Sequence, residues 1–270
     1  SHTHPYAKIR ASYAHLTHTI TGTLINLPSP SAVFVQMQHK SLWGWLVGAG
    51  LTQDLNRWLS AFVEYDRYDY GNSELKSLDS LFPGNVDRLT QHVRIVSSAV
   101  RLGLNVKFMS SFTPATRMMI TNPWLFYVGG FAAYYSADYQ YGGNYSSNVA
   151  GGSNQTYNNI VFQRGVAGGG QLGIQYHLHS PYFLGFNVSA ASNASKARVS
   201  VIAIPAPPGG LIPNLNHQFR IGSNVDMTGV LGADITPRTH LYAKIGASYA
   251  ELTHAITGTP IVTSPSSSAV

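Results

Sequence analysis

Charged side chains and cysteine are scarce in this sequence of 270 residues, and each scarcity excludes a class of protein. Asp, Glu, Lys and Arg together make up 10% of the residues, against about a quarter in an average soluble domain. That content argues against charge-driven disorder, a coiled coil and a basic surface that binds nucleic acid. Because cysteine is absent, a disulfide framework, a thiolate metal site and a cysteine nucleophile are excluded.

Long apolar runs are also absent. No stretch reaches the roughly 18 consecutive apolar residues of a membrane-spanning helix, and the best candidate, residues 124–135, is interrupted by glycines. The residues that are abundant are glycine, with 26, and tyrosine, with 16. If this chain crosses a membrane, we therefore expect it to cross with strands.

Alternation of apolar and polar residues is the main structural signal. Between residues 160 and 178, one alternate row is mostly apolar and the other carries mainly Gln, Gly and Ala. A period of two is typical of a β-strand with two different faces. The pattern predicts strands at residues 5–19, 41–53, 57–70, 90–108, 123–140, 159–178, 182–200, 217–235 and 239–255.

The connections between these strands differ in length. Those at residues 53–57, 177–182 and 235–239 are short, and the one at 109–122 is intermediate. The remaining ones are long and rich in Ser, Asn, Gly and Pro, at residues 20–40, 71–89, 141–158 and 201–216. Short turns that alternate with long loops indicate an antiparallel, up-and-down transmembrane β-barrel.

Tryptophans favour the same interpretation. Trp43, Trp45, Trp58 and Trp124 lie near predicted strand ends, where indole rings meet the membrane–water interface. Each strand also exceeds the roughly 9–11 residues that cross a bilayer. The alternative is a soluble barrel or sandwich whose apolar rows face a shared core.

The polar rows carry charges of both signs and are predicted to point into the barrel. Opposite charges in a narrow lumen can pair, so we expect a filled polar core and no open pore. The residues predicted for this lumen network are Glu64, Asp66, Arg101, Lys107, Arg220 and Asp226.

An internal repeat marks the end of the sequence. The segment Tyr6–Thr23 recurs as Tyr242–Thr259, with 15 of 18 positions identical. The sequence therefore predicts an eight-stranded barrel in residues 1–237, followed in residues 238–270 by a second copy of the first strand and its loop. The copy has three possible places: in a nine-stranded barrel, displaced from an eight-stranded one, or exchanged into a neighbouring molecule. Alternatively, the chain is an excerpt of a longer repeat protein.

Three segments resemble the opacity-protein and outer-membrane-protein-A-like family of small eight-stranded barrels. They are GWLVGAGLTQDLNRWLSAFVEYDRYDYG at 44–71, GGQLGIQYHLHSPYFLGFNVSA at 169–190 and MTGVLGADITPRTHLYAKIGASYAEL at 227–252. The resemblance implies a Gram-negative outer-membrane location. It also implies a surface role such as adhesion, envelope stabilisation or immune variation.

Catalytic and metal-binding patterns are weak. The pairs His2 with His4 and His177 with His179 lack further ligands, so no metal is expected. The candidates for hydrolysis show no spacing that orders them into a triad; they are His92, His217, His254, Asp66 and Asp69. We therefore expect no cofactor and no enzymatic activity.

The function predicted from the sequence is a non-enzymatic barrel of the bacterial outer membrane, with a structural, adhesive or self-assembling role. The alternatives are a barrel enzyme that modifies lipid A or cleaves proteins in the outer leaflet, and a narrow-pore transporter. The expected partners are outer-membrane lipid, lipopolysaccharide and a second copy bound through the duplicated strand, but no nucleic acid. The residues expected to contact lipopolysaccharide are Arg67, Arg164, Lys196 and Arg198.

Overall fold

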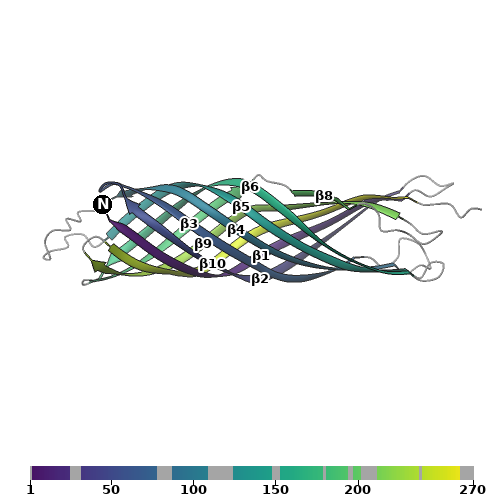
Figure 1. Cartoon of the computed structure of the whole chain (residues 1–270), viewed down its shortest axis with the longest axis horizontal. Helices are drawn as coiled ribbons and strands as arrows, with labels where there is room; N and C mark the ends of the chain where they lie inside the picture. Colours follow the sequence, from purple (N-terminus) through teal and green to yellow (C-terminus); the bar gives the residue numbers. More distant parts are fainter. Residues whose placement is uncertain are drawn as a thin grey trace, which may run out of the picture.

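The fold is a single β-sheet that closes into a ring (Figure 1). The computed structural model describes residues 2–24, 32–77, 87–108, 124–147, 153–178, 181–193, 197–201, 212–236 and 239–261. The strands are β1 Thr3–Leu24, β2 Ala32–Asp54, β3 Leu59–Ser77, β4 Asp87–Phe108, β5 Trp124–Ser147, β6 Ser153–His177, β7 Tyr182–Asn193, β8 Ala197–Val201, β9 Ile212–Thr236 and β10 Thr239–Ile261. The described part of the chain contains no helix with the length and apolar character of a membrane span.

Nine strand positions make up the ring. Neighbouring strands pair in chain order from β1 to β7, then β7 pairs with β9, β9 with β10 and β10 with β1. The short β8 lies along the other half of β9, so β7 and β8 together occupy one position. The prediction of an all-β fold with nine strand segments is confirmed.

The duplicated strand closes the ring. β1 and β10 pair in parallel and in register, from Thr3 opposite Thr239 to Gly22 opposite Gly258. All other strand pairs in the described ranges are antiparallel. Of the arrangements that the repeat allowed, the structure therefore has the nine-stranded ring, with the copy as its ninth strand.

The strands are inclined to the barrel axis, as Figure 1 shows. Following the paired residues once around the ring from His4 leads back to β1 at Ala14, ten residues further along. With ordinary strand spacing and rise, this displacement corresponds to a tilt of about 37°. A ring of this size has a lumen that side chains can fill.

One end of the barrel carries the β2–β3 turn, and we call the half next to this turn the lower zone and the opposite half the upper zone. In the turn, Asn56 Oδ1 accepts hydrogen bonds from the backbone N–H groups of Trp58, at 2.8 Å, and Leu59, at 2.9 Å. This is an Asx-type turn, which explains the tight connection after β2. The turn lies beside the N-terminal residues, because the N–H of Asp54 donates to the carbonyl oxygen of His2.

In the lower zone the outward side chains are mostly apolar, whereas the lumen holds the charged side chains together with a few rings such as Phe62 and Phe131. The outward row of β4 is exposed by 42–60% and consists of Val100, Leu102, Leu104, Val106 and Phe108. Its inward neighbours Arg101 and Asn105 are buried. This zone is therefore the reverse of a soluble protein, whose apolar side chains lie inside.

In the upper zone the usual arrangement returns. The inward side chains form an apolar core that includes Leu16, Leu75, Ile95, Phe219 and Leu252. The exposed outward side chains are mostly polar, among them Lys40, His92, Arg94, Gln140, Glu251 and Thr253. The apolar exceptions are Val35, Met37, Ile160 and Phe162.

Two β-bulges in the middle of the barrel change which alternate row points inward. In β3 the bulge lies between Asp69 and Asn72, and Gly71 adopts a positive φ of 80°. In β9 an extra residue lies opposite Glu251, between Ile221 and Asn224. One inserted residue moves every later side chain to the other face of the strand.

The bulge in β9 corrects one prediction. Arg220 was expected in the lumen because it belongs to the same alternate row as Asp226. Beyond the bulge that row faces outward, so Arg220 is exposed, while Phe219 and Ile221 are buried. Alternation alone does not show where an extra residue interrupts it.

Candidate functional site

A cluster of seven buried charged side chains fills the lumen of the lower zone. The cations are Lys8, Arg10, Arg101 and Lys244, and the anions are Glu64, Asp66 and Asp226. They come from β1, β3, β4, β9 and β10, so strands that are distant in sequence supply one cluster. We call it the ion cluster.

Arg101 lies at the centre of the ion cluster. Its Nη1 is 3.0 Å from Asp226 Oδ2, and its Nε is 3.3 Å from Asp66 Oδ2. It also donates a hydrogen bond to the hydroxyl oxygen of Tyr68. The planar guanidinium joins β3, β4 and β9 across the lumen, which suits its several fixed donors.

Lys8 and Arg10 supply the β1 side of the ion cluster. Lys8 Nζ lies 2.5 Å from Glu64 Oε1 and 2.5 Å from Asp66 Oδ1. Arg10 Nη1 lies 2.7 Å from Asp226 Oδ2, on the far side of β10. These contacts give three cations close carboxylate partners, as buried charges require.

The structure brings together four of the six residues predicted for the lumen network: Glu64, Asp66, Arg101 and Asp226. Lys107 also faces the lumen, but it lies at the lower end of the barrel, outside the ion cluster, and pairs there with Asp54. Arg10 was not predicted to belong to the lumen network, although it lies in the same alternate row as Lys8. Its carboxylate partner is on another strand, and the sequence around Arg10 does not indicate that partner.

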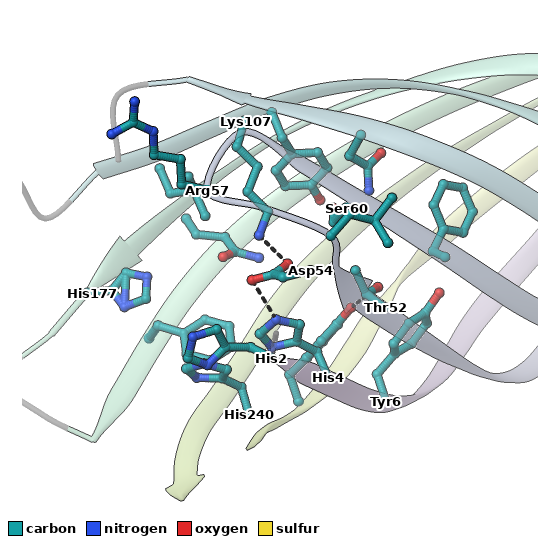
Figure 2. A pocket seen from close by; sticks show the side chains of 18 of the residues that line it. His2, His4, Tyr6, Thr52, Asp54, Arg57, Ser60, Lys107, His177 and His240 are labelled. Atoms are coloured by element: carbon teal, nitrogen blue, oxygen red, sulfur yellow. Dashed lines mark hydrogen bonds and ion pairs between the residues drawn. The ribbon is translucent and has the colours of Figure 1, made fainter. Parts of the chain in front are cut away.

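Below the ion cluster is a cavity of about 350 Å³ (Figure 2). Figure 2 shows Asp54 between Lys107 and His4, whose Nε2 is 3.2 Å from Asp54 Oδ2. His2, His4 and His240 gather on one wall, with ring centroids of His4 and His240 4.5 Å apart. Because Asn56 and Arg57 of the β2–β3 turn also line it, the cavity lies at the lower end of the barrel.

Aromatic and amide side chains form the deeper walls of the cavity. The Tyr6 and Tyr242 rings stack with centroids 4.7 Å apart, and Lys244 lies beside them. Gln171 Nε2 donates to Asn105 Oδ1 at 2.6 Å. Aromatic walls with a few polar groups are typical of small-molecule pockets.

A second cluster, of three histidines, lies in the core of the upper zone. His18 Nδ1 is 3.1 Å from His254 Nδ1, and His254 Nε2 is 3.1 Å from His217 Nδ1. All three side chains are buried, and the ring of Phe219 stacks on His254 with centroids 4.1 Å apart. We call these residues the histidine cluster.

Burial controls the protonation of the histidine cluster. It lowers the pKa of His18 to about 4, and burial together with the charge of His18 lowers the pKa of His217 to about 4. Burial and the other two imidazoles hold the pKa of His254 well below its ordinary value. The three rings are therefore neutral near pH 7, and each N···N contact contains one proton.

The candidates for hydrolysis have other contacts. Asp66 belongs to the ion cluster, His217 and His254 bond to each other, and Asp69 Oδ2 accepts a hydrogen bond from Arg94 at 2.7 Å. His92 is exposed on the outward face of β4. Within the described ranges, no set of three or more His, Asp or Glu side chains has the arrangement of a metal site.

The residues expected to contact lipopolysaccharide are only partly described. Arg67 and Arg164 are exposed on the outer surface, and Arg67 Nη1 donates to Ser98 Oγ at 3.3 Å. Lys196 lies outside the described residues. Arg198 belongs to β8, but its side chain also lies outside the described part.

Comparison with known proteins identifies one curated relative and no family. An uncharacterized protein of Coxiella burnetii is 42% identical over 138 residues, which cover 50% of this chain and 51% of that protein. The chain thus spans about half the length of the curated relative it matches. No protein-family model matches the chain, and no solved structure matches it.

Proposed function

We propose that this protein is a β-barrel of the bacterial outer membrane that acts as a non-enzymatic structural or adhesive element of the cell surface. The observation that carries the proposal is the reversal of faces along the barrel. A soluble barrel has no reason to place charged side chains inside and apolar ones outside in one half only. A barrel whose lower zone lies in lipid and whose upper zone lies in water requires this pattern.

The length of the apolar surface fits a bilayer. The exposed apolar row of β4 runs from Val100 to Phe108, and that of β10 from Leu241 to Tyr249, nine residues in each case. A transmembrane strand at this tilt needs about 9–11 residues. The strands themselves have up to 25 residues, so the upper zone would project from the membrane.

Tryptophans mark both borders of the apolar surface. Trp43 and Trp45 are exposed at its upper border, and Trp58 and Trp124 are exposed at its lower border. Indole rings prefer the region of the lipid headgroups on each side of a membrane. Their separation into two groups supports the placement of the lower zone in the bilayer.

The ion cluster supports a structural role over transport. Lys8, Glu64 and Arg101 meet within the lumen and leave the paired charges buried. A lumen closed by its own side chains gives no continuous water path. We expect planar-bilayer recordings of the reconstituted protein to show no stable ohmic conductance, and regular large openings would contradict a filled lumen.

The test of membrane insertion compares two positions on the same face of β10. Ile245 is 69% exposed in the middle of the apolar surface, whereas Thr253 is exposed in the upper zone. Ile245→Lys should destabilise folding into lipid vesicles by about 2–4 kcal/mol, and Thr253→Lys by about 1 kcal/mol or less. The measurement is the fraction of heat-modifiable, folded protein at increasing urea. Equal effects of the two substitutions, or a wild-type chain that stays monodisperse without any amphiphile, would show the proposal to be wrong.

A further inference from the structure

We infer that the cavity at the lower end of the barrel binds a small organic monoanion, and that Lys244 binds its charged group. This inference goes beyond the proposed membrane role and does not depend on it. It follows from the charges of the ion cluster and from the position of Lys244 between that cluster and the cavity.

The ion cluster contains one more cation than it has carboxylates. Lys8, Arg10 and Arg101 each have a carboxylate oxygen within 3.0 Å. Lys244 Nζ is 3.8 Å from Glu64 Oε2, beyond hydrogen-bond distance, and that carboxylate already bonds Lys8. Lys244 is therefore the cation with the weakest compensation.

The repeat explains this surplus. Lys244 is the copy of Lys8 and lies opposite it in the parallel pair of β1 and β10. In the lower zone the other inward residues of β10 are His240, Tyr242, Gly246 and Ser248, so the added strand brings a cation without a carboxylate. A buried ammonium whose nearest carboxylate is already bonded to another lysine is costly in a low-dielectric site.

The aromatic rings compensate Lys244 only in part. Its Nζ lies 4.1 Å from the centroid of the Tyr6 ring and 5.7 Å from that of Tyr242. A cation–π contact stabilises a buried ammonium less than a carboxylate in direct contact does. An anion in the cavity would provide the missing counter-charge.

The cavity has room and suitable walls for such an anion. Its volume is about 350 Å³, and Lys244 is among the residues that line it, with a side chain that is only 10% exposed. Lys107 also lines the cavity, but it is already paired with Asp54. The rings of Tyr6, Tyr127 and Phe183 offer apolar surface, and Asn105 and Gln171 offer amide groups. This combination fits a single-ring carboxylate better than a bare inorganic ion.

The test uses the full chain in a zwitterionic detergent and benzoate as the probe, with titration calorimetry at a pH near 6. Benzoate should bind to the wild type, and benzamide, its neutral isostere, should bind at least about tenfold more weakly. Lys244→Met should weaken benzoate binding by about tenfold or more. Lys40→Met removes the same charge from the exposed face of β2, and should leave the affinity unchanged.

Lys244→Arg keeps the charge and should retain most of the affinity, which separates loss of charge from loss of structure. Heat-modifiable migration of each variant reports that the barrel is folded. The inference is overturned if the wild type does not bind benzoate, if benzamide binds equally well, or if Lys244→Met binds benzoate as tightly as the wild type. None of these results depends on whether the lower zone inserts into lipid.

Discussion

The Nδ1 atoms of His18 and His254 lie 3.1 Å apart in the core of the upper zone, and the two histidines hold the same position in two copies of one strand. Because β1 and β10 pair in parallel and in register, each inward side chain of the repeat lies beside its copy. Tyr6 stacks on Tyr242 for the same reason. Aromatic rings and neutral imidazoles can pack side by side in this way without repulsion. The ammonium groups of Lys8 and Lys244, which the same register brings together, repel each other and need anions nearby.

The histidine cluster should make the upper zone sensitive to acid. The lowered pKa of His18 and His217, about 4 in each case, means that the unfolded chain binds more protons than the folded barrel between about pH 6.5 and pH 4. The free energy of unfolding is therefore not reduced by these histidines above about pH 6.5. Below that pH it falls by about 1.4 kcal/mol per pH unit for each additional proton that the unfolded chain binds, until about pH 4. The hydrogen-exchange protection factors of upper-zone amides, which are corrected for the intrinsic exchange rate at each pH, should therefore be lower at pH 4.5 than at pH 7.

A histidine variant provides the control for this pH dependence. His254→Phe keeps a ring against Phe219 and removes the central titrating group. The protection factors of upper-zone amides should then depend less on pH than in the wild type. An upper zone of the wild type with equal protection at pH 7 and pH 4.5 would contradict the role of the cluster.

Asp226 should be important for the stability of the barrel. Its Oδ2 accepts contacts from both Arg10, at 2.7 Å, and Arg101, at 3.0 Å. Asp226→Asn leaves two buried guanidinium groups without this anion and should destabilise the barrel by about 3–5 kcal/mol. Asp138→Asn is the matched control on the outward face of β5 and should change stability by about 0.5 kcal/mol or less. Urea denaturation monitored by gel migration measures both, and similar midpoints would show that Asp226 is not a structural anion.

Gly246 should not tolerate a side chain. It replaces Arg10 of the first copy, and a Cβ atom there would overlap the carbonyl oxygen of Met227 on β9. Gly246→Ala should therefore destabilise the β9–β10 pairing by about 1–3 kcal/mol. Gly168→Ala on β6 is the control, because a Cβ atom there meets nothing within 4 Å. Melting temperatures of both alanine variants equal to that of the wild type would contradict a close approach of β9 to β10 at Gly246.

Arg67 and Arg164 should contribute to binding of lipopolysaccharide. Both are exposed on the outer surface, and a cation near an anionic membrane surface contributes about 1 kcal/mol. The double substitution to Ala should reduce the rise in melting temperature that lipopolysaccharide causes in the wild type. Arg57→Ala, in the turn at the opposite end, should leave that rise intact. An unchanged rise in the double variant would exclude these contacts.

The sequence predicted where the strands lie, but it underestimated the length of several at their upper ends, as for β2, Ala32–Asp54, which was predicted at 41–53. The predicted strand at 90–108 corresponds to β4, Asp87–Phe108, and the one at 239–255 to β10, Thr239–Ile261. Part of the ion cluster could also be predicted, because Glu64, Asp66 and Arg101 fall in rows that stay inward. The partners of each charge could not, because they lie on other strands.

The sequence by itself determined the all-β fold, the strand positions and the existence of a second copy of the first strand. These are local properties, since alternation and identity can be seen along the chain. Only the tertiary structure decided that the copy pairs with its original in a nine-stranded ring, that the bulge in β9 turns Arg220 outward, and that the carboxylate nearest to Lys244 is 3.8 Å away and shared with Lys8. The physical reason is that register, ring closure and charge pairing depend on contacts between strands far apart in the sequence.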